Sequence, residues 1–205
     1  MMQLSIEMLN STHSVLIKNF SCIESAKELV GKKSNERKKI IQRSKEIDDF
    51  LKKEALPEQE CKLNTTHLFI DKDVNKLVGF VSLCNDSIPL QLEERRGYGI
   101  TYGTVPALKI ARLAVSNEYH GNGIANLMMQ YSAHIAAEIR HKSGLAFLTL
   151  DCYKHRKSFY EEKFGFIVNA AAEANKKNAQ APISMRLHLD TYLKQINKEL
   201  KDSRE

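Results

Sequence analysis

An apolar stripe of helical period, set between two strand-like runs, is the strongest constraint on the fold of this chain. The run Ala107 to Val115 precedes it, and the almost wholly apolar run Leu145 to Leu150 follows it after Gly144. The stripe recurs at i, i+3, i+4, i+7 and i+11 and consists of Ile124, Leu127, Met128, Tyr131, Ile135 and Ile139. This order predicts a strand, a crossover helix and a second strand of one sheet.

The first half predicts helices followed by a hairpin. The N-terminal third has a helical pattern, and its Lys/Glu-rich helix over Asn35 to Glu54 is expected to end at Pro57. Two β-like runs, Thr66 to Ile70 and Lys76 to Cys84, are separated by turn-prone residues, which indicates a hairpin. Residues Asp86 to Thr104 show no period and predict a long surface loop.

The last third predicts a short helix, two strands and a terminal helix. The helix covers Arg156 to Lys163, and the strand candidates are Phe166 to Val168 and Ile183 to Leu189. A polar connection, Ala170 to Ala181, lies between the strands, and Thr191 to Leu200 has the pattern of a helix. The fold class expected from this order is α+β.

Composition is that of a folded protein with a moderate excess of positive charge. Of the 205 residues, 42% are hydrophobic and 27% charged, which is ordinary globular usage and fits a single domain over residues 1–205. The 31 Lys and Arg outnumber the 25 Asp and Glu, for a net charge of +6. This excess favours an anionic ligand or nucleic acid without requiring either.

The cysteines and the N-terminus favour a cytoplasmic protein. Cys22, Cys61, Cys84 and Cys152 show no metal-ligand spacing and no C-x-x-C pair, so neither a metal site nor a disulfide framework is indicated. The chain begins without the features of an export signal, and no run is long and apolar enough for a membrane span.

Two glycines precede the long helix of the second half. Gly121 and Gly123 expose backbone N–H groups that no Cβ shields, at a helix N-terminus where the helix dipole favours an anion. An isolated G-x-G pair more often makes only a tight turn, and neither the P-loop nor the G-x-G-x-x-G pattern is present. On this segment alone, a turn and a phosphate site both stay open.

Two motifs in the correct order favour the phosphate site. From Ala107 to Val168 the chain resembles the GNAT superfamily of acetyl-CoA-dependent N-acetyltransferases. Its acyl-CoA motif Q/R-x-x-G-x-G/A is met by Gly123 and Ala125, with His120 in the Gln/Arg position. The second motif, F-Y-x-x-x-F/N-G-F, is met by Phe159, Tyr160, Phe164, Gly165 and Phe166. The resemblance implies a GNAT-like mixed, mostly antiparallel central sheet flanked by helices, with an acyl-CoA-binding strand-loop-helix.

The resemblance also implies roles for individual residues. Tyr160 would protonate the departing CoA thiolate. Phe159 would pack in the core and is also expected among the cofactor-binding residues. Backbone groups of Leu113, Ala114 and Val115 would pair with the pantetheine arm. Lys154 falls where relatives place a residue facing that arm. The pyrophosphate would be held by His120, Gly121, Asn122, Gly123, Ile124, Ala125 and Asn126. No metal is implied.

Upstream segments are similar to the GNAT branch that includes tRNA-acetylating toxins. These segments are Asn19 to Cys22, Asp48 to Ala55, and the predicted hairpin. The basic stretch Gly31 to Lys45 would be an insertion and the helix after Asp190 an extension. The acceptor stays open between a small amine and an aminoacyl-tRNA-like macromolecule. Residues 1–65 are expected on the acceptor side, 66–189 as the core sheet with the acetyl-CoA site, and 190–205 as a C-terminal extension.

Three matters stay open at this point. The general base is unassigned: Arg112 stands where some relatives of the family place a catalytic Glu, and Asp86, Glu118, Asp151 and a water relay stay open. A catalytically idle acyl-CoA sensor and a nucleic-acid-binding protein are the alternative functions; Tyr160 argues against the sensor, and the absence of an aromatic stacking platform argues against the second. The oligomeric state, a homodimer included, is not indicated by the sequence.

Overall fold

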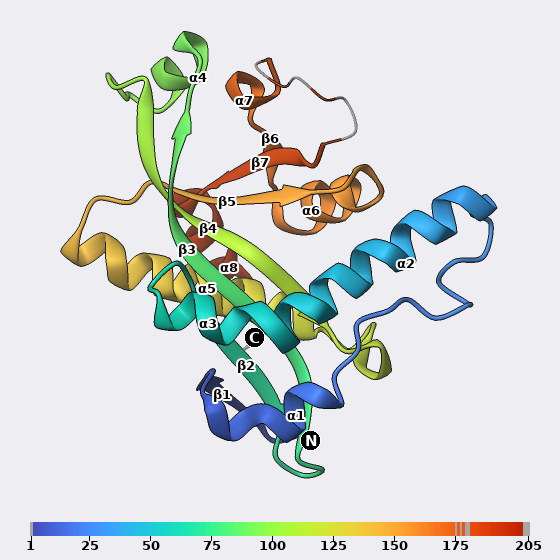
Figure 1. The fold of residues 1–205 in the computed structure, drawn as a ribbon. Coiled ribbons are helices and arrows are strands. Elements are labelled where there is room, and N and C mark those ends of the chain that lie inside the picture. Colours follow the sequence, from blue (N-terminus) through green and yellow to red (C-terminus); the bar gives the residue numbers. More distant parts are fainter. Residues whose placement is uncertain (1, 175, 177, 179–180, 203–205) are drawn as a thin grey trace. The chain divides into compact units, whose positions relative to one another are not determined.

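The fold is seen in a computed structural model that describes residues 2–174, 176, 178 and 181–202. Two compact units make up the chain. One is formed by Met1–Leu83 and Arg112–Met129, the other by Cys84–Ala111 and Gln130–Glu205. Seven strands follow one another in the order β1-β2-β3-β4-β5-β7-β6, and β3, β4 and helix α5 each contribute residues to both units (Figure 1).

The predicted hairpin is confirmed in the first unit. Strand β2 (Thr65–Asp71) pairs antiparallel with the start of β3 (Lys76–Pro89), and the turn between them contains Asn75 in the left-handed region at φ 52°. The expected all-helical N-terminus is wrong, because β1 (Leu4–Met8) pairs antiparallel with β2. Five residues with three apolar positions are too few to separate a strand from a helix by period alone.

The predicted basic helix is confirmed, but Pro57 does not end it. Helix α1 (Ser14–Lys18) precedes α2 (Ser34–Asp49), which continues through a π-helical turn, Phe50–Glu54, into α3 (Ala55–Glu60). Pro57 is the third residue of α3. A proline removes one i→i−4 hydrogen bond of a helix, but here the Ala55 N–H already donates to the Phe50 carbonyl five residues back, so the helix leaves the regular pattern just before Pro57.

Aromatic rings fill the core of the first unit. The Phe20 and Phe80 rings meet edge to face with centroids 5.6 Å apart, and Phe50 stacks on Phe80 at 6.4 Å. Ile40 and Leu51 are buried on the same side of the helical segment, as the sequence pattern predicts. This packing holds α2 and the π-helical turn against β2 and β3.

Gly79 of β3 lies where no side chain fits. A Cβ built at this position would lie 2.9 Å from the carbonyl oxygen of Ala114 and 3.1 Å from the Met128 sulfur. We therefore expect Gly79→Ala to lower the free energy of unfolding by about 1–3 kcal/mol, the usual cost of overpacking. Gly144→Ala is the matched control, since a Cβ there meets nothing within 4 Å. Urea denaturation of both variants measures the difference, and equal midpoints would contradict the close approach.

The expected long loop over Asp86 to Thr104 is wrong. Strand β3 runs on to Pro89, helix α4 (Leu92–Gly97) follows, and β4 (Thr104–Val115) begins at the end of the expected loop. Helix α4 is anchored by Glu94, whose carboxylate lies 2.6 Å from the guanidinium of Arg186, with side chains only 14% and 4% exposed. The Tyr98 ring also stacks on His188 with centroids 4.7 Å apart.

The crossover predicted for the second half is confirmed. Strands β4 and β5 (Phe147–Cys152) are parallel, and helix α5 (Ile124–Lys142) connects them. Helix α6 (Lys157–Phe164) ends at Gly165, whose φ is +76°. The remaining elements are β6 (Ile167–Val168), α7 (Ala170–Ala174), β7 (Ile183–His188) and α8 (Leu189–Asp202).

The sheet is mixed and mostly antiparallel, as predicted. Strand β7 pairs antiparallel with both β5 and β6. The polar connection predicted over Ala170 to Ala181 contains the short helix α7, and residues 175, 177 and 179–180 of it, like 203–205 of the predicted extension, lie outside the described residues. Within the described ranges, no helix combines the length and apolar character needed to cross a membrane.

Candidate active site

The end of β4, the glycine loop and the start of α5, which form the predicted acyl-CoA-binding segment, lie in the first unit. Leu113, Ala114 and Val115 end β4. The ladder between β4 and β5 covers only Ala107–Ile110 of β4, so these three residues lie beyond its end. A 3-10 turn, Asn117–Tyr119, then leads to the glycines, and the Asn117 N–H donates to the Ser21 carbonyl.

The loop presents donors at the start of α5. Gly121 and Gly123 have φ of +83° and +78°, and a Cβ on either would meet nothing within 4 Å. The backbone N–H groups of Gly121, Gly123, Ile124 and Ala125 bond to no other described residue. A helix N-terminus with unpaired N–H groups and open space around its glycines has the chemistry that a phosphate needs.

The His120 side chain binds protein groups. Its Nδ1 lies 2.6 Å from a Glu28 carboxylate oxygen and its Nε2 3.0 Å from the Val115 carbonyl oxygen, which only accepts. Burial alone raises the pKa of Glu28, but hydrogen bonds from Ser25 and His120 together bring this pKa below its ordinary value. His120 thus ties the loop to the segment before α2, and its ring nitrogens are used in doing so.

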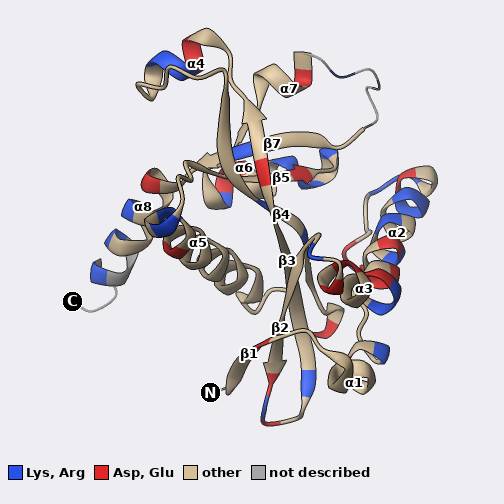
Figure 2. Cartoon of the chain, turned by 60° about the vertical axis from the view of Figure 1, so that its left-hand side comes forward, with Lys and Arg blue, Asp and Glu red and all other residues tan. Residues whose placement is uncertain are grey.

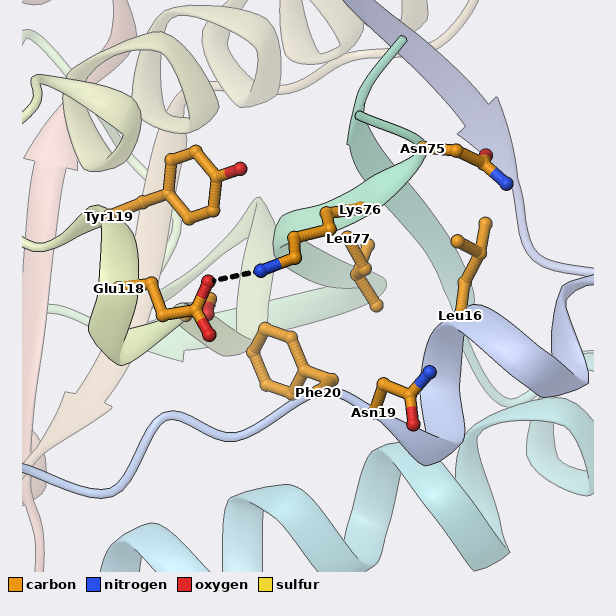
Figure 3. Close-up of a pocket in the computed structure, with 9 residues that line it drawn as sticks. Leu16, Asn19, Phe20, Asn75, Lys76, Leu77, Glu118 and Tyr119 are labelled. Atoms are coloured by element: carbon orange, nitrogen blue, oxygen red, sulfur yellow. Dashed lines mark hydrogen bonds and ion pairs between the residues drawn. The ribbon is translucent and has the colours of Figure 1, made fainter. Parts of the chain in front are cut away.

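A cavity of about 300 Å³ begins just before the glycines and was not predicted. Ser116, Glu118 and Tyr119 line one side of it. The other lining residues come from α1 and the segment after it and from the turn between β2 and β3. They are Leu16, Asn19, Phe20, Asn75, Lys76 and Leu77. Figure 3 shows the ion pair of Lys76 and Glu118, 2.7 Å long, between the rings of Phe20 and Tyr119. Three segments distant in sequence form this cavity, so no local pattern could have indicated it.

The second predicted motif lies in the second unit, on and around α6. Lys154 is exposed in the 3-10 turn before the helix. Phe159 is only partly buried, so its expected place in the core is wrong; the buried rings of the motif are Phe164 and Phe166. The Tyr160 ring meets Phe159 edge to face at 5.2 Å and Phe166 at 5.9 Å.

The Tyr160 hydroxyl is kept protonated by its surroundings. Burial, and after it the nearby Cys152 thiol, raise the pKa of Tyr160 to about 12. The positive charge of Arg156 lowers this pKa by a smaller amount. A phenol with this pKa carries its proton throughout the physiological range and remains a hydrogen-bond donor. This is the protonation state that a general acid needs.

Each carboxylate considered as the general base has a partner in the structure. Glu118 is paired with Lys76 in the first unit, where Arg112, at the position of a catalytic Glu in some relatives, lies over the Phe50 ring at 4.9 Å. In the second unit, Asp151 is paired with Lys109, and Asp86 accepts a hydrogen bond from Thr149.

Residues 37–166, which include both motifs, match the family model of the acetyltransferase (GNAT) family. The chain belongs to this family. It is therefore an acyltransferase that uses acetyl-CoA as cosubstrate, as the resemblance implied. No curated protein sequence matches the chain.

Solved structures of two toxins share the fold at low identity. A Tyr-to-Phe mutant of KacT matches with a TM-score of 0.70 and 16% identity, over 94% of this chain and 99% of that one. AtaT complexed with acetyl-methionyl-tRNAfMet matches with a TM-score of 0.66 and 15% identity, over 88% and 94%. AtaTR bound with AcCoA matches with a TM-score of 0.64 and 15% identity, over 94% of this chain and 98% of that one. At these identities the likeness concerns the fold.

Proposed function

We propose that the chain acetylates the amino group of an aminoacyl-tRNA, with Tyr160 as the acid for the CoA thiolate. The observation that carries the acetyl-CoA part is the set of unpaired N–H groups at Gly121, Gly123, Ile124 and Ala125, which suits a pyrophosphate. The backbone of Leu113 to Val115, beyond the β4–β5 ladder, suits the pantetheine arm. Lys154 and Phe159 complete the proposed cosubstrate contacts, with Asn122 in the loop and Asn126 on the first turn of α5, while His120 positions the loop through Glu28 and the Val115 carbonyl.

The transfer needs two proton movements. The unprotonated amine attacks the thioester carbonyl carbon, a C–N bond forms and the C–S bond breaks. The thiolate takes the Tyr160 proton. The new amide nitrogen loses a proton, which water carries to the Tyr160 phenolate to restore the phenol. A backbone N–H of Leu113 to Val115 polarises the thioester oxygen. The proposed roles make a catalytically idle sensor the poorer explanation, since a sensor needs no acid.

The acceptor assignment rests on the α2 surface and on one neighbour. Arg37, Lys38, Lys39 and Lys45 are exposed on α2, and Figure 2 shows Lys and Arg interspersed with Asp and Glu along this helix. AtaT, a protein of the same fold, is seen with acetyl-methionyl-tRNAfMet. Phosphates bound by such lysines release counterions, so binding weakens as salt rises.

Acetyl transfer from labelled acetyl-CoA tests the acceptor. The panel is aminoacyl-tRNA, deacylated tRNA, spermidine and free amino acids, and we expect label on aminoacyl-tRNA. Because each contacted phosphate contributes about −0.7 to the slope of log affinity against log salt, we expect the KM for tRNA to rise steeply between about 50 and 300 mM salt. The double variant Lys38→Glu with Lys39→Glu should raise this KM further, by about 10-fold.

The matched control is Lys194→Glu with Lys198→Glu on α8, which removes the same charge from exposed positions. Equal effects of the two double variants would contradict a tRNA surface on α2. Transfer to spermidine alone, independent of salt, would show a small-amine acetyltransferase.

We also propose that the whole chain acts as one GNAT domain, with residues 1–65 on the acceptor side, 66–189 as the core and 190–205 as an extension. Light scattering of the purified protein tests whether it is a homodimer, and pull-down from its own host tests for a protein partner of the kind that AtaR is for AtaT.

A further inference from the structure

A strip of polar side chains crosses one face of the sheet in the second unit. Lys109 of β4 lies opposite Thr149 of β5, and Thr149 lies opposite Arg186 of β7. Residues directly opposite on neighbouring strands share a face, and so does Asp151, two positions after Thr149. Lys and Asp are depleted in strands, yet here they lie on two strands that each have neighbours on both sides.

Asp86 is held over this face from two directions. The Thr149 hydroxyl donates to its Oδ2 at 2.7 Å, and the backbone N–H of Ser87 donates to its Oδ1 at 2.8 Å. Thr149 is only 2% exposed, so the hydroxyl that orients Asp86 is fixed by the sheet. A carboxylate has about four lone-pair positions, and two of those on Asp86 remain for a further donor.

Lys109 is paired with one carboxylate and feels the charge of a second. Its ammonium is 2.7 Å from Asp151 Oδ2, and the side chains are 30% and 42% exposed. Burial, the largest single influence, lowers the pKa of Lys109, but the hydrogen bond to Asp151 and the charges of Asp151, Asp86 and Cys84 together raise it. Lys109 is therefore an ammonium and donates. Two carboxylates around one ammonium leave one negative charge in excess, and Arg186 and Glu94 neutralise each other.

We infer that Asp86, Lys109 and Asp151 form the acceptor subsite and select an α-aminoacyl group. The two carboxylates bind the amino group of the acceptor. Lys109 donates to the carbonyl oxygen of the ester, whose carbon is bonded to the α-carbon that carries the amine in every α-aminoacyl ester. An alkyl polyamine offers Lys109 no acceptor and brings further positive charge towards it. The inference rests on the proposed acetyl transfer and adds to it the chemical feature by which the acceptor is recognised.

Two acceptors that differ only in the ester group test the subsite. Methionine methyl ester has the carbonyl, and 3-(methylthio)propylamine is the same molecule without the ester group. The ester group lowers the pKa of its own amine, so kcat/KM is calculated on the concentration of unprotonated amine. On this scale we expect the intact protein to favour the ester by about 10-fold or more beyond its ratio in Lys109→Met, because only the ester offers Lys109 an acceptor. Lys109→Arg should restore most of this preference.

Lys72→Met is the matched control. Lys72 forms an exposed ion pair, 2.5 Å long, with Glu7 in the first unit, so its loss removes a comparable surface pair away from the candidate site. The ester-to-amine ratio should not change in this variant. A ratio in Lys109→Met equal to that of the intact protein would overturn the subsite.

Asp86→Asn is a second, independent variant in case Lys109→Met fails to fold. It keeps the shape and the hydrogen bond from Thr149 but removes the charge, so KM for both acceptors should rise by about 10-fold while acetyl-CoA affinity stays the same. An unchanged KM would also overturn the subsite. Absence of transfer by the intact protein to any amine or aminoacyl-tRNA is a different result, which contradicts the proposed function itself.

Discussion

Tyr160→Phe is expected to lower kcat by about 100-fold or more while acetyl-CoA binds as before, because the loss of a general acid typically costs 100- to 10,000-fold. The ring keeps its edge-to-face contacts with Phe159 and Phe166, and only the proton is removed. Steady-state rates and calorimetry with acetyl-CoA measure the two quantities. Since the pKa of Tyr160 is about 12, the rate should show no loss from Tyr160 ionisation as the pH rises to about 10.

Tyr192→Phe provides the control for removing a hydroxyl from the same aromatic cluster. The Tyr192 ring meets Phe164 edge to face at 6.5 Å and is 3% exposed. Its variant should keep turnover. If Tyr160→Phe were as active as Tyr192→Phe, Tyr160 would be a packed aromatic residue and the thiolate would take its proton from water.

Gly123→Asp is expected to weaken acetyl-CoA binding by about 100-fold, the effect of about 2.7 kcal/mol. A Cβ at Gly123 meets nothing within 4 Å, so the side chain fits the free protein, and its carboxylate then stands where unpaired N–H groups would receive a phosphate. Calorimetry with CoA measures the affinity.

Two variants separate the charge from the backbone conformation. Gly123→Asn has nearly the same size without the charge and tolerates a positive φ, so it should bind CoA much better than Gly123→Asp. Gly99→Asp places the same residue at a φ of +67° with equally open surroundings, in the second unit rather than in the loop, and should leave CoA affinity intact. CoA affinity unchanged in folded Gly123→Asp would remove the loop from the cosubstrate site.

The sequence predicted the elements whose signals are local. The stripe of α5, the glycines on either side of it and the hairpin of β2 and β3 are each set by neighbouring residues, so period and turn chemistry suffice. The prediction of an element fails where a residue distant in sequence determines the conformation. Helix α4 looked like a loop because its anchor, Arg186, lies about 90 residues further along the chain. Pro57 misled because it follows a π-helical turn that changes the hydrogen-bond pattern of the helix, and this turn has no signal in the sequence.

The candidate site divides in the same way. Gly121, Gly123 and Tyr160 carry motifs that are visible in the sequence. The Glu28 partner of His120 and the alignment of Lys109 with Thr149 depend on tertiary contacts and strand register, which a single sequence does not reveal.

The Arg186–Glu94 pair limits how the segment between β3 and β4 can be altered. Surface connections usually tolerate deletion or grafting, since lengthening or shortening a loop changes its closure entropy little. Here a shortened connection would remove Glu94 and leave the Arg186 guanidinium, 4% exposed, without its counter-ion, at a cost of about 3–5 kcal/mol. A chimaera that exchanges this segment between relatives must therefore carry the residue opposite it on β7 as well, so that the two positions are inherited as one module.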